Sequence, residues 1–450
     1  MWLFPSVPTS NYNARGWKVS MRADNWQRSL GALFVAQTMT MVAFSFVFPF
    51  LPLYIQSLGI TDTTEAAQWA GVAVAATALS MSVVQPIWGN LADRYGRRPM
   101  VLRSMIGAAV TISLMGLVSS VPQLVFLRFV QGIVSGTLAA GNALAASFVP
   151  KHRLGFTLGL MQVAVFIGSS LGPLIGGVLA DNWGYRVPCF AAAALMLASA
   201  AIVVAFVHES FVAPPASAPR PGPLADARSL LGLSPLPMLV AVIFLIQLGA
   251  QVIAPVLTLF IEELNGEESA ATVAGLVIAA TGVMSAIAAL VLGRLGDRIG
   301  HTVILTVCLA GAAIAYFPQA LVREVWHLLL LRMLLGVFLG GLMPSANTLL
   351  ANLVPRERRG AAFGLTATAA SVSNGVGPLS GAAIATGLGM RAIFVCTGVL
   401  YVVGFAWALW GLQRRSVPDA AGRSQTAQAA IPDITELATA PRVDDGSGRS

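Results

Sequence analysis

A short segment that pairs a carboxylate with an arginine occurs twice in this chain. Residues 89–96 and 293–300 share glycine, leucine, aspartate, arginine and glycine at the same five positions. In each copy the acid, Asp93 or Asp297, follows an apolar run at the point where a helix would end. A carboxylate there can lie against the positive N-terminal end of another helix, a contact of up to ~2 kcal/mol that is lost when the helices separate. The repeat therefore predicts a duplicated structure with a charge contact that can be made and broken.

Residue types that support catalysis, metal binding or nucleotide hydrolysis form no recognisable groups. Cys189, Cys308 and Cys396 lie in apolar runs without the spacing of a metal site, and we expect them to pack as small core side chains. No Gly-x-x-x-x-Gly-Lys-Ser/Thr segment is present for nucleotide phosphates. We therefore expect no enzyme, no metal site and no bound cofactor.

The composition indicates where these residues are placed. Of the 450 residues, 56% are hydrophobic and 10% are charged, whereas soluble proteins carry roughly 25% charged residues. The bulk of the chain must therefore lie in a lipid bilayer, which a helix of about 20 apolar residues can cross. Twelve such runs are predicted, with eleven or thirteen as alternatives because short turns blur their ends: 31–55, 68–91, 99–119, 122–148, 153–180, 187–207, 235–262, 271–292, 302–320, 325–352, 359–385 and 390–412.

The basic residues predict the orientation. When the spans alternate from a cytoplasmic N-terminus, 22 of the 27 lysines and arginines fall on the cytoplasmic side. The other side receives three arginines and eight acids, among them Asp181 and the pair Glu262–Glu263. Positively charged loops remain in the cytoplasm, so both termini are predicted to be cytoplasmic. The net charge of +8 then reports topology, and we expect no nucleic-acid partner.

The repeat extends over both halves of the chain. Arg128 and Arg332 are 204 residues apart, and Gly172–Pro173 and Gly377–Pro378 are 205 apart. Parallel repeats of six spans predict a pseudo-twofold axis along the membrane normal and a central cavity. The predicted organisation is a cytoplasmic N-terminal segment (1–28), a first six-helix bundle (29–207), a proline-rich linker (208–234), a second six-helix bundle (235–413) and a disordered tail (414–450). Translation from Met1 and translation from Met21 remain alternatives.

Several motifs resemble those of the major facilitator superfamily over residues of about 25–413. The segment from Asp93 to Arg98 is similar to the loop motif between the second and third helices of that superfamily. Arg128 with Gln131–Gly132 resembles the fourth-helix motif of its exporters. The fifth span resembles their antiporter motif through Gly159, Gly168, Gly172, Pro173, Gly176 and Gly177. Together these motifs resemble the bacterial twelve-span drug:proton antiporter family, in its multidrug efflux branch.

The resemblance implies a multi-pass exporter of the bacterial inner membrane that works by alternating access and is driven by the proton gradient. It implies that Asp93 latches the outward-facing state against a helix of the other half and that Gly89 permits the close approach. The gating and proton-coupling residues would be Gly89, Asp93, Arg94, Gly96, Arg97, Arg98, Arg128, Asp297 and Arg298. The fifth-span glycines with Pro173 would form a kinked, tightly packed gate, of which the second half retains a degraded copy.

The polar residues inside the spans include no acid near the midplane. Arg128 lies about 9 Å into the fourth span at 1.5 Å per residue, and an arginine inside the membrane is expected to face a cavity or a partner. The tentative cavity residues are Gln37, Asn142, Gln162, Gln247, Gln251, Arg332, Asn347 and Asn374. Arginines and amides without acids favour a neutral, amphipathic or anionic small molecule as substrate, carried by a monomer together with protons.

Two other interpretations remain open at this stage. An importer or facilitator of a small metabolite would use the same fold, although the fifth-span motif favours export. A membrane partner or sensor that transports nothing is a second alternative, although the short tails contain no signalling domain.

Overall fold

The computed structural model describes residues 23–150, 153–209, 236–266, 269–354 and 359–412. The predictions for most of the N-terminal segment and the linker, and for the tail, lie outside these residues. In the described part of the chain the secondary structure is helical, as predicted. The first half comprises α1 (Ala23–Val47), η1 (Phe48–Phe50), α2 (Leu51–Ser57), α3 (Thr63–Tyr95), α4 (Arg97–Met115), α5 (Val121–Val134), α6 (Thr137–Phe148), α7 (Leu154–Trp183) and α8 (Val187–Phe206).

The second half repeats this order. It comprises α10 (Leu236–Asn265), α11 (Ala270–Ile299), α12 (His301–Tyr316), η3 (Phe317–Leu321), α13 (Val325–Leu353), α14 (Arg359–Leu388) and α15 (Met390–Leu412). Each of the twelve predicted apolar runs coincides with one or more of these helices. Within the described ranges, nine helices are long and apolar enough to cross a membrane. The other three runs correspond to α4, to α5 with α6, and to α14.

Three spans are more segmented than the apolar runs suggest. The first run, predicted to begin at residue 31, begins at Ala23 and continues through η1 and α2, where Pro49 and Pro52 interrupt the hydrogen bonding. The fourth is divided into α5 and α6 around Gly136, and the ninth ends in the 3₁₀ helix η3. The twelve predicted spans are consistent with these helices, because the segments of each divided run are consecutive in the chain.

Turns between spans are tight and recur at equivalent positions. Gly96 separates α3 from α4 with a φ of 99°, and Gly300 separates α11 from α12 with the same φ. Residues with a side chain rarely adopt this backbone conformation. At the opposite end of α3, the carboxylate of Asp62 accepts hydrogen bonds from the N–H groups of Thr64 and Glu65 at 2.7 and 2.9 Å. These N–H groups, that of Glu65 foremost, hold the pKa of Asp62 below its usual value.

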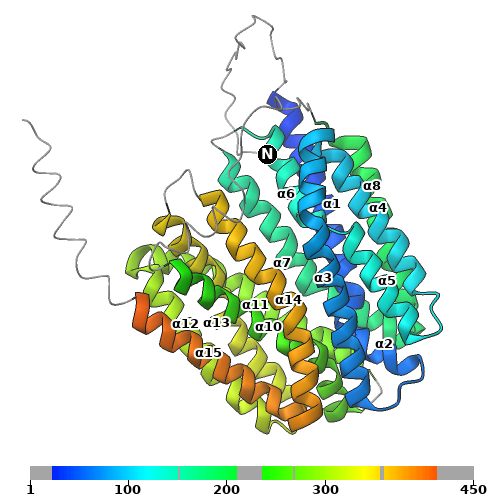
Figure 1. Ribbon diagram of the computed structural model, residues 1–450, viewed down its shortest axis with the longest axis vertical. Helices are drawn as coiled ribbons and strands as arrows, with labels where there is room; N and C mark the ends of the chain where they lie inside the picture. The colour runs from blue at the N-terminus through cyan, green and yellow to red at the C-terminus, as the bar shows by residue number, and fades with distance from the viewer. Residues whose placement is uncertain (1–22, 151–152, 210–235, 267–268, 355–358, 413–450) are drawn as a thin grey trace, which may run out of the picture.

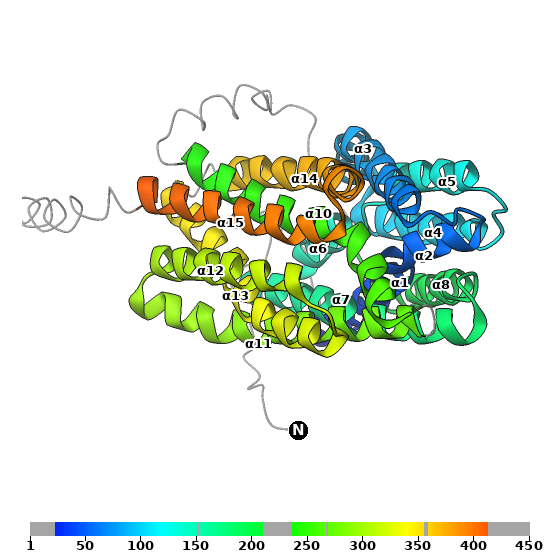
Figure 2. The same cartoon turned by 90° about the horizontal axis from the view of Figure 1, so that it is seen from below.

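The two halves lie side by side (Figures 1 and 2). Helix α7 packs on α11, and α3 packs on α14. These two pairs are equivalent under the repeat, as the pseudo-twofold axis requires. We call the end of the bundle with the turns at Gly96 and Gly300 the basic end, and the end with Asp62 and Asp181 the acidic end.

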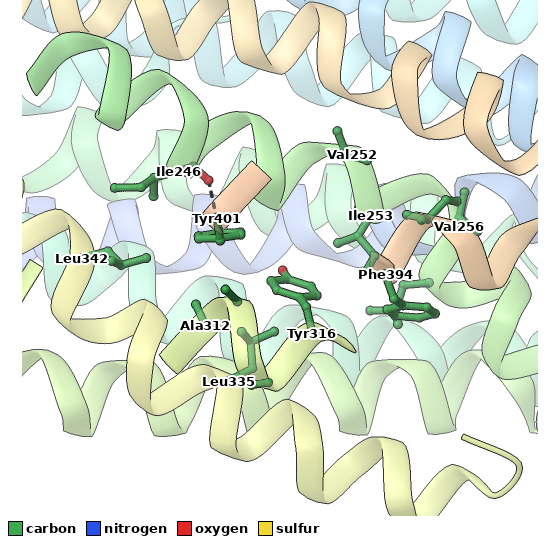
Figure 3. Close-up of a cluster of buried hydrophobic side chains, with 14 of the residues drawn as sticks. Ile246, Val252, Ile253, Val256, Ala312, Tyr316, Leu335, Leu342, Phe394 and Tyr401 are labelled. Carbon is green, nitrogen blue, oxygen red and sulfur yellow. Dashed lines mark hydrogen bonds between the residues drawn. The ribbon is translucent and has the colours of Figure 1, made fainter. Parts of the chain in front are cut away.

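Each half has its own apolar core, and the second core extends into the first half. Figure 3 shows part of the second core, in which the rings of Tyr316 and Tyr401 stack at 5.4 Å and the Tyr401 hydroxyl donates to the carbonyl of Ile246 at 3.2 Å. The same cluster includes Phe50, Leu53, Ala67 and Ala180 of the first half. These four residues lie toward the acidic end, so the halves are joined there by continuous packing.

Glycines near the acidic end bring the backbones of the two halves into contact. A Cβ atom on Gly177 would lie 2.4 Å from the carbonyl oxygen of Ala271, and one on Gly275 would lie 2.4 Å from that of Pro173. In the other pair of helices, a Cβ on Gly71 would lie 2.9 Å from the carbonyl oxygen of Pro378. These distances leave no room for a side chain, so the acidic end is closed between α7 and α11 and between α3 and α14.

Glycines of the same four helices near the basic end have open space around them. A Cβ atom on Gly89 of α3, Gly159 of α7, Gly293 of α11 or Gly364 of α14 would meet no atom within 4 Å. Helices α3 and α14, which touch near the acidic end, diverge toward the basic end (Figure 1). The described state is closed at the acidic end and open at the basic end.

The substitution Gly177→Ala tests the importance of backbone contact at the acidic end. The added methyl group would force α7 away from α11, and we expect the free energy of unfolding to fall by about 1–3 kcal/mol, as for other overpacked sites. We also expect the acidic end to open, measured as a longer spin-label distance between α7 and α11 by double electron–electron resonance. Gly159→Ala is the matched control on the same helix, and equal effects of both substitutions would contradict this account.

Candidate functional site: the central cavity and its two closures

A cavity of about 680 Å³ lies between the halves. Of its described lining residues, most come from the first half, and the second half supplies Gln251, Ile278 and Asn374. The apolar part of the lining includes Phe44, Phe48, Met41 and Met81, and the polar part includes Thr77, Gln85, Arg128, Gln131, Ser135, Thr137, Asn142 and Ser169. Arg128 is the only charged side chain among the described lining residues.

Arg128 is held within this wall by its neighbours on α5 and α3. Its side chain is 5% exposed, and its Nη1 atom donates to Oε1 of Gln131 at 3.1 Å. The Thr77 hydroxyl of α3 donates to the carbonyl of Arg128 at 2.9 Å. A Cβ atom on Gly132 would lie 2.3 Å from the carbonyl oxygen of Thr77, so α3 and α5 cross in close contact. This crossing fixes the position from which Arg128 faces the cavity.

The tentative cavity residues divide into two groups. Asn142, Gln251 and Asn374 line the cavity, and the amide of Gln251 donates to Oδ1 of Asn374. The remaining residues are absent from this lining: Gln37, Gln162, Gln247, Arg332 and Asn347.

The rotation of each helix explains two of these absences. Gln37 is fully buried on α1 against Gly141 of α6, and Gln162 is exposed on α7. Arg332, the repeat partner of Arg128, instead packs in the second core, where its guanidinium carbon lies 6.0 Å from the ring centre of Tyr316 and 5.9 Å from that of Phe394. Cation–π attraction can stabilise a guanidinium in this position. The two equivalent arginines therefore have different surroundings.

The fifth-span glycines form two contact surfaces on α7. Gly168, Gly172 and Gly176 recur every four residues and face α1, where a Cβ atom on each would lie within 2.3–2.5 Å of Met41, Ser45 or Phe46. Gly177 faces α11 in the other half. Helix α7 continues through Pro173 without a break in its assigned range. This arrangement leaves little free space between α1, α7 and α11 near the acidic end.

The second half keeps part of this packing. A Cβ atom on Gly377 would lie 2.5 Å from Cβ of Gln251, and one on Gly381 would lie 1.9 Å from the carbonyl oxygen of Val252. The copy in α14 is therefore degraded in sequence but still provides close packing against α10, as its equivalent in α7 does against α1.

A carboxylate joins the halves at the acidic end. Asp181, near the end of α7, accepts hydrogen bonds from the N–H groups of Thr272 at 2.6 Å and Ala271 at 3.3 Å. These N–H groups belong to the first turn of α11, whose partial positive charge attracts an anion. The same kind of contact that the sequence predicts for Asp93 at the basic end is thus present for Asp181 at the acidic end.

The loop motif at the basic end is anchored within the first half. Asp93 is in the last turn of α3, and its side chain is outside the described ones, so its latch role stays a prediction. Arg97 Nη1 donates to the carbonyl of Ala143 at 3.2 Å, and Arg98 Nη2 donates to that of Val204 at 2.6 Å. Arg94 is exposed.

Glu209, which the sequence did not single out, caps the start of α4. Its carboxylate accepts hydrogen bonds from the N–H groups of Arg97 at 3.0 Å and Arg98 at 2.7 Å. Gly96 offers no side chain to cap α4, which is the only sequence signal that a distant acid was needed. Glu209 therefore ties the loop motif to the end of α8.

The second copy of the loop motif is arranged differently. Asp297 and Arg298 are exposed, and Asp297 Oδ1 lies 3.1 Å from Nε2 of His301. His301 is the first residue of α12, and its side chain is 11% exposed. The short turn at Gly300 places His301 one helical turn after Asp297, against Gly296.

Comparisons with known proteins agree with this architecture. Residues 33–265 and 239–443 match the family model described as Major Facilitator Superfamily. The chain is 37% identical to the multidrug resistance protein MdtG of Salmonella dublin over 85% of this chain and 95% of that protein. It is 35% identical to MdtG of Serratia proteamaculans over 87% of this chain and 95% of that protein.

A solved structure shares the fold. The bacterial homologue of the human lysosomal transporter Spinster, in an inward-facing and occupied conformation, superposes with a TM-score of 0.72 at 16% identity. The match covers 86% of this chain and 97% of that protein.

The substitution Asp181→Asn tests the charge contact between the halves. We expect loss of about 1 kcal/mol from this contact, which reduces the population closed at the acidic end roughly fivefold relative to the open one. The measurement is disulfide crosslinking between cysteines introduced near the ends of α7 and α11. Asp62→Asn is the control, because Asp62 caps only its own helix. An unchanged crosslinking yield in Asp181→Asn would show that packing alone closes this end.

The repeated six-helix halves, the central cavity and the match to the family model over most of the chain agree, and the chain belongs to the major facilitator superfamily.

Proposed function

We propose that this protein exports drugs or other amphipathic small molecules across the bacterial inner membrane in exchange for protons. Relatives at 35–37% identity over most of their length are named multidrug resistance proteins. Of the fifth-span glycines that resemble the antiporter motif, Gly168, Gly172, Gly176 and Gly177 pack against α1 or α11, whereas Gly159 lies toward the open end and meets no atom. The observation that carries the proposal concerns α3, α7, α11 and α14. Near the acidic end these helices touch across the two halves at Gly71, Gly177 and Gly275, whereas near the basic end Gly89, Gly159, Gly293 and Gly364 have no neighbouring atoms.

The four glycines without neighbours at the basic end support an alternating-access mechanism. When Gly89, Gly159, Gly293 and Gly364 come into contact, the basic end would close and the acidic end would open. With both termini and the basic end in the cytoplasm, the described state is open to the cytoplasm and ready to receive substrate from the cell. Asp181 stabilises this state, and Asp93 is proposed to stabilise the opposite one, so the two carboxylates act at opposite ends of the same motion.

The cavity favours a substrate without a permanent positive charge. Arg128 is charged, and the described lining residues include no carboxylate to balance a cation. The apolar and aromatic side chains provide a surface for the hydrophobic part of an amphipathic molecule. The transporter is proposed to act as a monomer, because each chain contains both halves and the whole cavity.

Export and its coupling are tested together by the accumulation of a fluorescent amphipathic dye in cells. Energised cells that express the protein are expected to accumulate less dye than control cells, and an uncoupler should abolish the difference. Asp93→Asn is expected to lower gradient-dependent export roughly tenfold, which corresponds to a contact of about 1.4 kcal/mol. The matched control is Asp297→Asn. Higher accumulation in expressing cells, abolished by the uncoupler, would identify an importer instead.

The alternation of glycine contacts is tested by Gly89→Val. The Cβ atom of the new side chain meets no atom within 4 Å in the described state, so we expect the thermal unfolding midpoint to change little. Closure at the basic end should be hindered, and export should fall at least about fivefold, because a branched side chain at a backbone contact costs about 1–3 kcal/mol. Gly31→Val is the control, since Gly31 also has open space but lies on α1. Normal export by Gly89→Val would exclude a contact at this position.

A further inference from the structure

The fourth span is interrupted in the first half only. α5 ends at Val134 and α6 begins at Thr137, with Ser135 extended and Gly136 at a φ of 127°. The equivalent positions 204 residues later, Leu339 to Gly341, lie inside the continuous helix α13. An interrupted helix at membrane depth is tolerated where it is buried in protein or lines a cavity. The interruption is therefore a feature of the first half that the repeat does not require.

The carbonyl groups on the α5 side of the interruption have partners. The indole N–H of Trp88 donates to the carbonyl of Ile133 at 2.7 Å, and Arg103 Nη2 donates to that of Ser135 at 3.4 Å. The guanidinium of Arg103 also lies 3.4 Å from the centre of the Trp88 ring. These two side chains satisfy acceptors that a continuous helix would have satisfied itself.

The N–H groups on the α6 side have no side-chain cap. The N–H groups in the first turn of a helix have no acceptor within the helix, and Gly136 provides no side-chain cap. Ser135, Gly136 and Thr137 all line the central cavity. The partially positive end of α6, a helix of 12 residues, is therefore at the wall of the substrate cavity.

Buried donors line the same cavity, two of them at this helix end and one on α5. Arg128 lines the same cavity, and its Nε and Nη2 atoms have no hydrogen-bond partner among the described residues. The hydroxyls of Ser135 and Thr137, which are 7% and 2% exposed, likewise have none within the described ranges. A buried guanidinium without a counter-charge is costly. The cavity wall thus combines a positive charge, a helix N-terminus and free donors, with no carboxylate among the described lining residues.

We propose that the N-terminus of α6 and Arg128 form a subsite for the anionic headgroup of an amphipathic substrate, such as a carboxylate. This inference rests on the proposed function in that it takes the central cavity as the substrate site. The headgroup accepts hydrogen bonds from the guanidinium, from the first N–H groups of α6 and from the hydroxyl of Thr137. The apolar part of the substrate lies against Phe44 and Phe48, which line the same cavity.

The test compares three probes that share a 1-naphthylmethyl group and carry an anionic, a neutral or a cationic headgroup. Binding of 1-naphthylacetate, 1-naphthylacetamide and 1-naphthylmethylammonium to the purified full chain in nanodiscs is measured by calorimetry. We expect the anion to bind at least about tenfold more tightly than the neutral amide. Arg128→Gln should remove this preference while the affinity for the amide changes less than about twofold. Equal binding of anion and amide by the unmodified protein would overturn the proposal.

A second pair of variants separates the helix end from the general charge of the cavity. Thr137→Asp places a carboxylate in the first turn of α6, where it should replace the substrate anion and abolish the preference for 1-naphthylacetate. Ser169→Asp adds the same charge to the cavity wall from α7, and the preference should fall less than about threefold. Equal effects of the two variants would overturn the role of the helix end. Retained amide binding shows that each variant is folded.

The outcome is independent of whether the protein exports its substrates. If cells fail to export any amphipathic dye but the purified protein prefers the anion, the subsite stands and the proposed function fails. If cells export the dye and the purified protein shows no preference for the anion, the subsite fails and the proposed function stands.

Discussion

Close approach of helix backbones is the constraint on which this structure depends. In lipid, apolar side chains gain little from contact with one another, so helices associate through packing at small residues. Gly177 and Gly275 bring α7 and α11 together, and Gly71 does the same for α3 and α14. Each of these contacts is between a helix of one half and a helix of the other. The interface between the halves therefore combines backbone contacts at a few positions with the packing of Phe50, Leu53, Ala67 and Ala180 against the second core.

With this constraint, the observed contact of Asp181 and the proposed contact of Asp93 would suffice to control the motion. Asp181 binds the first turn of α11 at the closed end, and Asp93 is positioned at the end of α3 for an equivalent contact at the open end. Each contact is worth at most ~2 kcal/mol, which is small compared with a folded core but comparable to the difference between two conformations of a transporter. Weak contacts at opposite ends thus bias a motion that strong packing would prevent.

The repeat does not make the halves equivalent in chemistry. Arg128 and Arg332 occupy matching positions, yet Arg128 faces the cavity and Arg332 lies near Tyr316 and Phe394 in the second core. The interruption between α5 and α6 likewise has no counterpart in α13. Both differences place polar groups of the first half at the cavity. The polar lining of the cavity is therefore concentrated in the first half, while the second half contributes fewer of the described lining residues.

The sequence alone determined the membrane class, the twelve helical runs and the six-plus-six repeat, because apolar length and residue spacing depend only on the order of residues. It also identified Arg128, Asn142, Gln251 and Asn374 as polar residues within spans, all of which line the cavity. Only the tertiary structure decided that Gln37 and Gln162 do not, since neighbouring helices fix the rotation of each span about its axis. No pattern in the sequence marked the interruption of the fourth span at Ser135 and Gly136. The capping role of Glu209 depends on a contact between residues 111 and 112 apart in sequence. Contacts between distant segments are set by packing, which no local pattern records.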